Sequence, residues 1–131
     1  MLKIYPDCWV MVADGSEARL FTNVGNVTRV SLKQEQHLSP ENLLDDGPSG
    51  HRPPEENEQA ADEATFAKQL AQRLNAAALH DEYEHLVLMA DPQTLGQMRP
   101  QLHVETQKRL VGEIAKTMTG APLEDIQNAL S

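Results

Sequence analysis

The chain has 131 residues and a mass of 14.5 kDa, enough for one domain that needs neither a disulfide nor a metal to hold its core. Twenty acidic and eleven basic residues give a formal charge of −9, which argues against a protein that coats DNA or RNA and against an anionic-membrane binder. One cysteine, Cys8, excludes an internal disulfide, and we expect a buried, inert thiol. With no membrane-length apolar run and no signal-peptide pattern, we expect a soluble, cytoplasmic protein.

The first quarter of the sequence predicts three strands. Residues 8–13 form a short apolar run that is typical of a buried strand. Turn residues at 14–16 lead into a second strand over 18–22, so the pair reads as a hairpin. Residues 27–32 alternate apolar and polar, which predicts a third, half-buried strand.

An acidic segment follows and carries nearly all of the net charge. Nine acids and a single base, Arg52, lie between Gln34 and Glu63. The segment is rich in proline and glycine and poor in large apolar residues, so residues 34–56 are predicted to form a long, mobile loop. Loops of this length are usually functional or disordered, and a solvated insertion and a functional loop both remain open. We expect one domain over residues 1–131.

The rest of the sequence alternates helical and strand patterns. Alanines and leucines at three- and four-residue steps predict a helix over 57–79, and the apolar run at 86–90 is typical of a central strand. Residues 110–118 fit either a helix or a strand. Shorter helices are expected at 94–98 and 122–130. The order of elements therefore predicts an α/β fold.

Two acids follow predicted strands, where α/β proteins often place ligand contacts. Asp14 stands before Gly15 and Ser16, a pattern that also suits an ordinary hairpin turn. Asp91 precedes Pro92, where it can equally cap the following helix.

The five histidines form no compact metal-binding motif. His51 with Glu55, or His37 with Asp45 and Asp46, is the nearest approach to one. We predict no metal and no cofactor.

Several stretches resemble one known family. They are 9–21 (WVMVADGSEARLF), 66–75 (FAKQLAQRLN), 83–92 (YEHLVLMADP), 95–99 (LGQMR) and 113–119 (EIAKTMT). In this order they are similar to segments of the bacterial host attachment protein family. That family in turn resembles the middle domain of archaeal and eukaryotic peptide-chain release factors and of their bacterial counterparts.

The resemblance implies a mixed five-stranded sheet in which a hairpin and a third strand precede a long loop, followed by alternating helices and strands. It implies that residues 110–118 form a strand. In release factors the loop before the first long helix carries Gly-Gly-Gln, whose glutamine helps place the water that cleaves the peptidyl ester. The matching loop here, 46–52, reads DGPSGHR. It lacks that motif, so the sequence leans away from an enzyme.

The preferred hypothesis is a non-catalytic binding module that contacts a ribosome, a tRNA or a translation-linked protein, or that serves host attachment. It predicts that basic side chains gather on one face. The candidate binding residues are Asp14, Arg19, Gly47, Gly50, His51, Arg52, Asp91, Arg99 and Lys116.

Two alternatives come from other classes of protein. One is a hydrolase of an ester or phosphoester, in which Asp14, His51 and Asp91 meet in one pocket. The other is a dimeric adaptor that associates through a sheet edge or a helix face. Neither DNA nor a membrane is expected as a partner.

Overall fold

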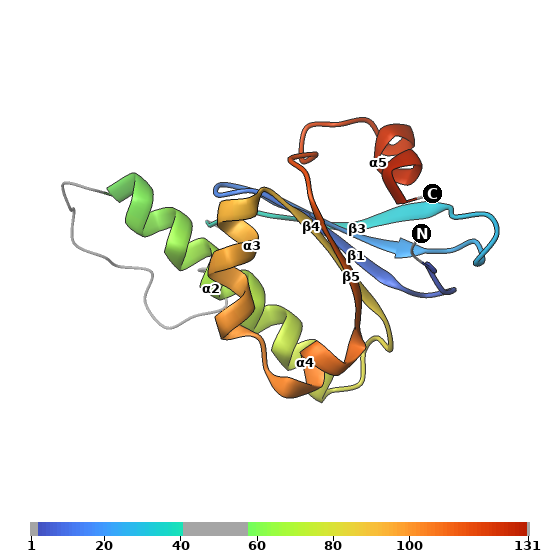
Figure 1. The fold of residues 1–131 in the computed structure, drawn as a ribbon, viewed down its shortest axis with the longest axis horizontal. Helices are drawn as coiled ribbons and strands as arrows, with labels where there is room; N and C mark the ends of the chain where they lie inside the picture. Colours follow the sequence, from blue (N-terminus) through green and yellow to red (C-terminus); the bar gives the residue numbers. More distant parts are fainter. Residues whose placement is uncertain (1–2, 41–57, 131) are drawn as a thin grey trace.

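The computed structural model describes residues 3–40 and 58–130, and Figure 1 shows their arrangement. Five strands form one mixed sheet in the order β3-β2-β1-β4-β5. β1 pairs with β2, and β2 with β3, in antiparallel fashion, whereas β1 and β4, and β4 and β5, run parallel. The predicted α/β fold with a mixed five-stranded sheet is therefore confirmed.

The first two strands lie where the sequence predicts them: β1 spans Trp9–Ala13 and β2 spans Ala18–Asn23. The third prediction is wrong, because β3 spans Leu32–Leu38 and not 27–32. The Asn26 side chain accepts hydrogen bonds from the backbone N–H groups of the two residues at 28–29, which holds a turn where a strand was expected.

The prediction also placed the start of the acidic loop too early. Residues 34–38 belong to β3, and their side chains are exposed except for Leu38 at the end. A strand at the rim of a sheet is often polar on both faces, so its composition resembles that of a loop. The rest of the predicted loop from residue 41 to residue 56 lies outside the described residues, and the prediction that it is mobile lies outside them as well.

The remaining elements follow in alternation, and the strand that the resemblance implied at 110–118 is present as β5. One helix, α4, was not predicted, because its six residues are almost all polar. The elements are α2 (Glu58–Leu79), β4 (Leu86–Ala90), α3 (Pro92–Met98), the 3₁₀ turn η1 (Arg99–Gln101), α4 (Val104–Arg109), β5 (Leu110–Ala115) and α5 (Leu123–Leu130). None of the helices in the described part of the chain is long and apolar enough to span a bilayer.

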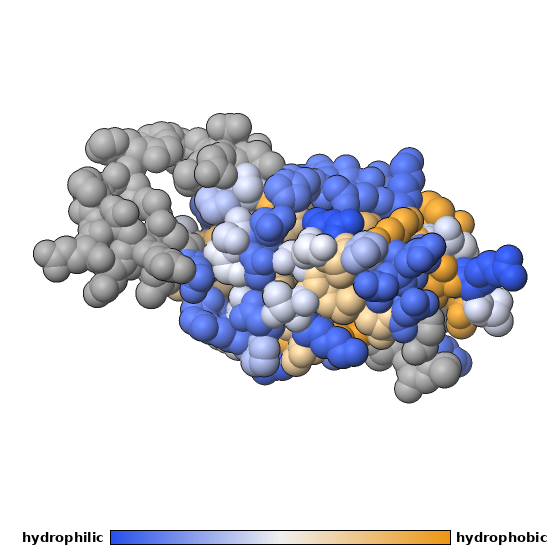
Figure 2. Space-filling view, turned by 90° about the horizontal axis from the view of Figure 1, so that it is seen from above, coloured by the Kyte–Doolittle hydropathy of each residue, from blue (hydrophilic) through white to orange (hydrophobic). Residues whose placement is uncertain are grey.

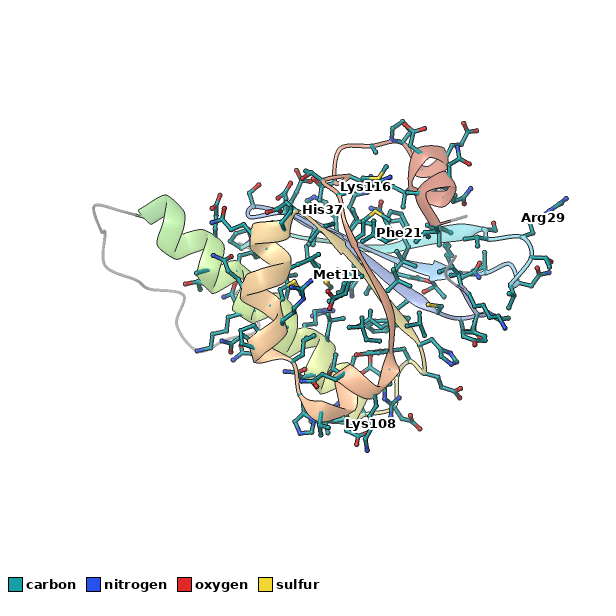
Figure 3. All side chains as sticks on the ribbon, viewed as in Figure 1. Met11, Phe21, Arg29, His37, Lys108 and Lys116 are labelled. Carbon is teal, nitrogen blue, oxygen red and sulfur yellow. The ribbon has the colours of Figure 1, made fainter. Side chains whose placement is uncertain are left out.

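Helices cover the two faces of the sheet unequally. α2, α3 and α4 lie on one face and the short α5 lies on the other (Figure 1). Figure 3 shows Met11 of β1 toward the α2 side and Phe21 of β2 toward the α5 side, as alternation along a strand requires. Each belongs to a separate buried cluster, so the sheet divides the core into two layers.

The α2 layer is built on small and branched side chains. Ala67, Ala71 and Leu74 are fully buried against the sheet, and the alanines let the helix axis approach closely. Ala64, which lies three residues before Ala67 in the same helix, is exposed. Asn75 ties this layer together, because its side chain donates to the carbonyl of Gln101 and accepts from the backbone N–H of the residue that caps α4.

The α5 layer is thinner. Ile126 and Leu130 of α5 are buried over the sheet, while Val111 and Ile114 of β5 are only partly covered. Figure 2, which views this side of the molecule, shows apolar surface among hydrophilic side chains. Cys8 is fully buried in this layer, and burial raises the pKa of its thiol to about 12. The thiol therefore stays protonated at neutral pH.

Candidate functional site

The three parallel strands end at one side of the sheet, which we call the carboxyl end. Asp14 directly follows β1, Asp91 follows β4 and Thr117 lies just after β5. All three line a shallow depression of about 290 Å³. The sequence thus placed its two candidate acids in one hollow, at the position where open α/β sheets bind ligands.

Asp14 is held by four hydrogen bonds. Its Oδ1 accepts from the backbone N–H groups of Ser16 (2.7 Å) and Glu17 (2.9 Å) and from the Ser16 hydroxyl. Its Oδ2 accepts from the hydroxyl of Thr119 at 2.5 Å, across 105 positions of sequence. Burial raises the pKa of Asp14, but the hydrogen bonds from Thr119, Ser16 and Glu17 outweigh burial and leave that pKa below its usual value. Asp14 is therefore an ionised turn-former.

Asp91 is engaged in the same manner by its own helix. One carboxylate oxygen accepts from the backbone N–H of Thr94 at 3.1 Å and the other from the Thr94 hydroxyl at 2.8 Å. This is the N-cap of α3, with Pro92 at the first helical position. The sequence left open whether Asp91 caps α3 or contacts a ligand. The hydrogen bonds show that it caps α3.

One residue of α2, Glu63, also lines the depression at the carboxyl end. Glu63 packs so closely against the β1–β2 turn that a Cβ added to Gly15 would lie 2.7 Å from its side-chain carbons. On the other side, Leu38 at the end of β3 lies opposite Ala18 at the start of β2. Leu38 at the end of β3 and Glu63 of α2 thus both lie near the β1–β2 hairpin. The candidate residues Gly47, Gly50, His51 and Arg52 fall between these two points and lie outside the described residues.

Arg19 has a structural role at this end of the molecule. Its guanidinium donates to the carbonyl oxygens of Thr119 (3.1 Å) and Ala121 (2.7 Å) and to the Gln34 side chain, and it lies over the Phe21 ring. Together with Asp14 it fixes the connection between β5 and α5 onto the β1–β2 hairpin.

The basic candidates do not share one face. Arg19 belongs with Phe21 to the α5 side of the sheet. Arg99 follows α3 on the α2 side and pairs with Glu113 through two nitrogens, at 2.6 and 2.8 Å. Lys116 is exposed near the carboxyl end, as Figure 3 shows. The predicted gathering of basic side chains is thus wrong for Arg19 and Arg99, because strands and helices place them on opposite layers.

The described residues at this site offer little for metal binding or for acid–base catalysis. Within the described ranges, no three His, Cys, Asp or Glu side chains approach closely enough to hold a metal ion. A hydrolytic carboxylate needs a lone pair directed at a water or substrate. Asp14 and Asp91 direct theirs at local N–H and hydroxyl groups, so the geometry favours turn and cap roles over proton transfer.

The sequence analysis did not identify Thr119 as a contact of Asp14. Its side chain is buried and bridges to Asp14 from the other end of the chain. Only the topology could have indicated this contact, because the parallel strands β1, β4 and β5 end at the same side of the sheet and bring the residues that follow them close together.

The chain was compared with known proteins and protein families. A family model described as bacterial archaeo-eukaryotic release factor family 12 matches residues 7–130, which include every described strand and helix. No curated protein matches the chain.

Proposed function

Because the chain belongs to bacterial archaeo-eukaryotic release factor family 12, we propose that it is a translation-linked binding module without peptide-release activity. One observation carries the proposal. The release-factor family model matches residues 7–130, while the sequence contains no Gly-Gly-Gln. The matching model is a release-factor family, so host attachment forms no part of the proposal.

The charge of the chain decides which kind of ribosomal contact fits best. Residues 41–57 carry five acids and one base, and RNA phosphates repel carboxylates. A basic protein of the translation apparatus suits such a segment better than bare RNA does. The candidate contacts for such a partner are then the acids of this segment, Glu41, Asp45, Asp46, Glu55 and Glu56.

Co-sedimentation with purified bacterial ribosomes over a salt series tests the proposal. We expect saturable binding that weakens as salt rises. A Glu55→Gln/Glu56→Gln variant should bind less, whereas Glu124→Gln/Asp125→Asn on α5, which removes the same charge elsewhere, should bind like the unaltered chain. Absence of binding at low salt would refute the translation link.

A peptidyl-tRNA hydrolysis assay tests the non-catalytic half separately. We expect no release above the rate with buffer alone. Release that the unaltered chain accelerates, and that a deletion of residues 41–56 abolishes, would contradict the proposal even if ribosome binding were found.

A further inference from the structure

A second hollow region lies at the opposite end of the parallel strands, which we call the amino end. It consists of two adjoining depressions of about 620 and 430 Å³, which share Trp9, Thr22 and Glu82. The larger one is lined by residues that precede β1 and β4, and the smaller one continues between α2 and β3. We call the pair the amino-end groove. Its size is in the range of pockets that take a small ligand or side chain.

Aromatic rings concentrate in this groove. The chain has five aromatic residues, and Tyr5, Trp9 and Tyr83 all line the larger depression together with His85. Tyr5 stacks on His85 with ring centroids 4.2 Å apart, and Trp9 stacks on Tyr83 at 4.6 Å. Trp and Tyr bodies of this kind are the side chains most enriched at protein–protein contacts.

Carboxylates surround the rings. Asp7, Glu82 and Glu84 line the larger depression, and within residues 3–40 and 58–130 no hydrogen bond or ion pair engages their side chains. Glu35 adds a further acid along the smaller depression, where Arg73 is the only base among the lining residues. A groove of ring faces and unpaired carboxylates attracts cations and repels phosphates.

Two residues that line the larger depression, Asp81 and Tyr83, already bind a guanidinium of the protein itself. Arg109 donates to the Asp81 carboxylate at 3.0 Å and to the carbonyl of Tyr83, and its guanidinium lies 5.9 Å from the centre of the Tyr83 ring. The same two kinds of group, carboxylates and a ring, line the larger depression at Glu82, Glu84 and Trp9. Arginine is the side chain that best uses both at once.

We propose that the amino-end groove binds an extended, arginine-bearing peptide segment of a protein partner. Tyr5 and Trp9, which are partly exposed, supply the aromatic surface, and Glu82 and Glu84 supply the charge. This inference is independent of the translation link, because it concerns the opposite end of the sheet and a different set of residues.

Trp9 provides a local readout, since it is the only tryptophan and lines both depressions. We would titrate the full chain with a tetra-arginine peptide with blocked termini and follow tryptophan fluorescence. A saturable change is expected, with weaker binding of tetra-lysine and none of tetra-glutamine. No saturable change with tetra-arginine would overturn the proposal.

Matched variants separate the groove from the general acidity of the chain. Glu82→Gln/Glu84→Gln should weaken tetra-arginine binding about five- to tenfold. Glu124→Gln/Asp125→Asn on α5 removes the same charge and should leave binding within about twofold. Equal weakening by both pairs would show non-specific attraction, and tighter binding of a single-stranded oligonucleotide would show a nucleic-acid surface; either result refutes the proposal.

Amide chemical shifts give a second, independent measurement. With tetra-arginine, the largest shifts are expected in residues 5–9 and 81–85. Shifts confined to residues 41–57 would place the cation on the acidic segment and contradict a site in the groove.

Discussion

The two ends of the parallel strands use their acidic side chains in opposite ways. At the carboxyl end, Asp14 and Asp91 accept hydrogen bonds from their own turn and helix, and they stabilise the chain path. At the amino end, Glu82 and Glu84 have no such partner within the described ranges. An acid at the end of a strand is therefore not available for binding by its position alone. Its availability depends on whether its carboxylate already accepts hydrogen bonds within the protein.

This difference predicts that substitutions at the carboxyl end cost stability and that those at the amino end do not. The largest cost is expected for Arg19→Ala, because the carbonyl oxygens of Thr119 and Ala121 lose a charged donor. We expect a loss of about 2–3 kcal/mol in the free energy of unfolding, measured with urea. Arg19→Lys should recover only part of it, since an ammonium lacks the planar fork. A loss below about 0.5 kcal/mol would show that the connection is held elsewhere.

Asp14→Ala should cost about 1–2 kcal/mol, because the backbone N–H groups of Ser16 and Glu17 and the hydroxyl of Thr119 lose their acceptor. Urea unfolding at pH 7 measures this loss. Ser16→Ala removes only the weaker, exposed hydroxyl contact and serves as the control, with an expected loss of less than half as much.

The pH dependence of this effect follows from the lowered pKa of Asp14. The ionised carboxylate stabilises the fold above the usual pKa of 3.8, and this contribution is lost as the pH falls through the lower folded value. The stability difference between the unaltered chain and Asp14→Asn should therefore narrow below about pH 4. A difference that widens in acid would contradict an ionised Asp14.

Asp91→Ala should cost about 1 kcal/mol, the usual effect of removing an N-cap. Asp91→Asn keeps an acceptor for the N–H of Thr94 and should lose only a few tenths. Thermal or urea unfolding distinguishes the two. If Asp91→Ala left stability unchanged, the carboxylate would be free for another role and the contrast between the two ends would fail.

The smallest effect is expected at the amino end. Glu82→Gln/Glu84→Gln should change the free energy of unfolding by less than about 0.5 kcal/mol, because both side chains are exposed. Urea unfolding under the same conditions as for Asp14→Ala provides the comparison. A loss above 1 kcal/mol would mean that these acids support the fold.

The sequence predicts the fold well where burial dictates composition. The apolar run at 86–90 is typical of a central strand, and the alanine and leucine spacing of α2 predicts its helix closely. The predictions failed for the elements at the edges of the fold. β3 at the rim of the sheet is as polar as a loop, and α4 has almost no apolar residue. Helix α4 is instead fixed by tertiary contacts such as those of Asn75.

The candidate site was only half accessible from sequence. The pattern brings Asp14 and Asp91 to one end of the sheet, because parallel strands end together. It cannot show that Thr119 reaches Asp14, since that bond joins residues 105 positions apart. The amino-end groove was overlooked for the same reason: Trp9 and Tyr83 become neighbours only when β1 pairs with β4.

The strand order also sets a sequence of events during synthesis. The antiparallel meander β3-β2-β1 closes through short connections, so it can form as soon as residue 38 has left the ribosome. Its β1 then presents an unpaired edge until β4 has been made, because Trp9 must wait for Leu86. The acidic stretch from Gln34 to Glu63 lies between β1 and β4 in the sequence, so most of it is synthesised while this edge is still unpaired.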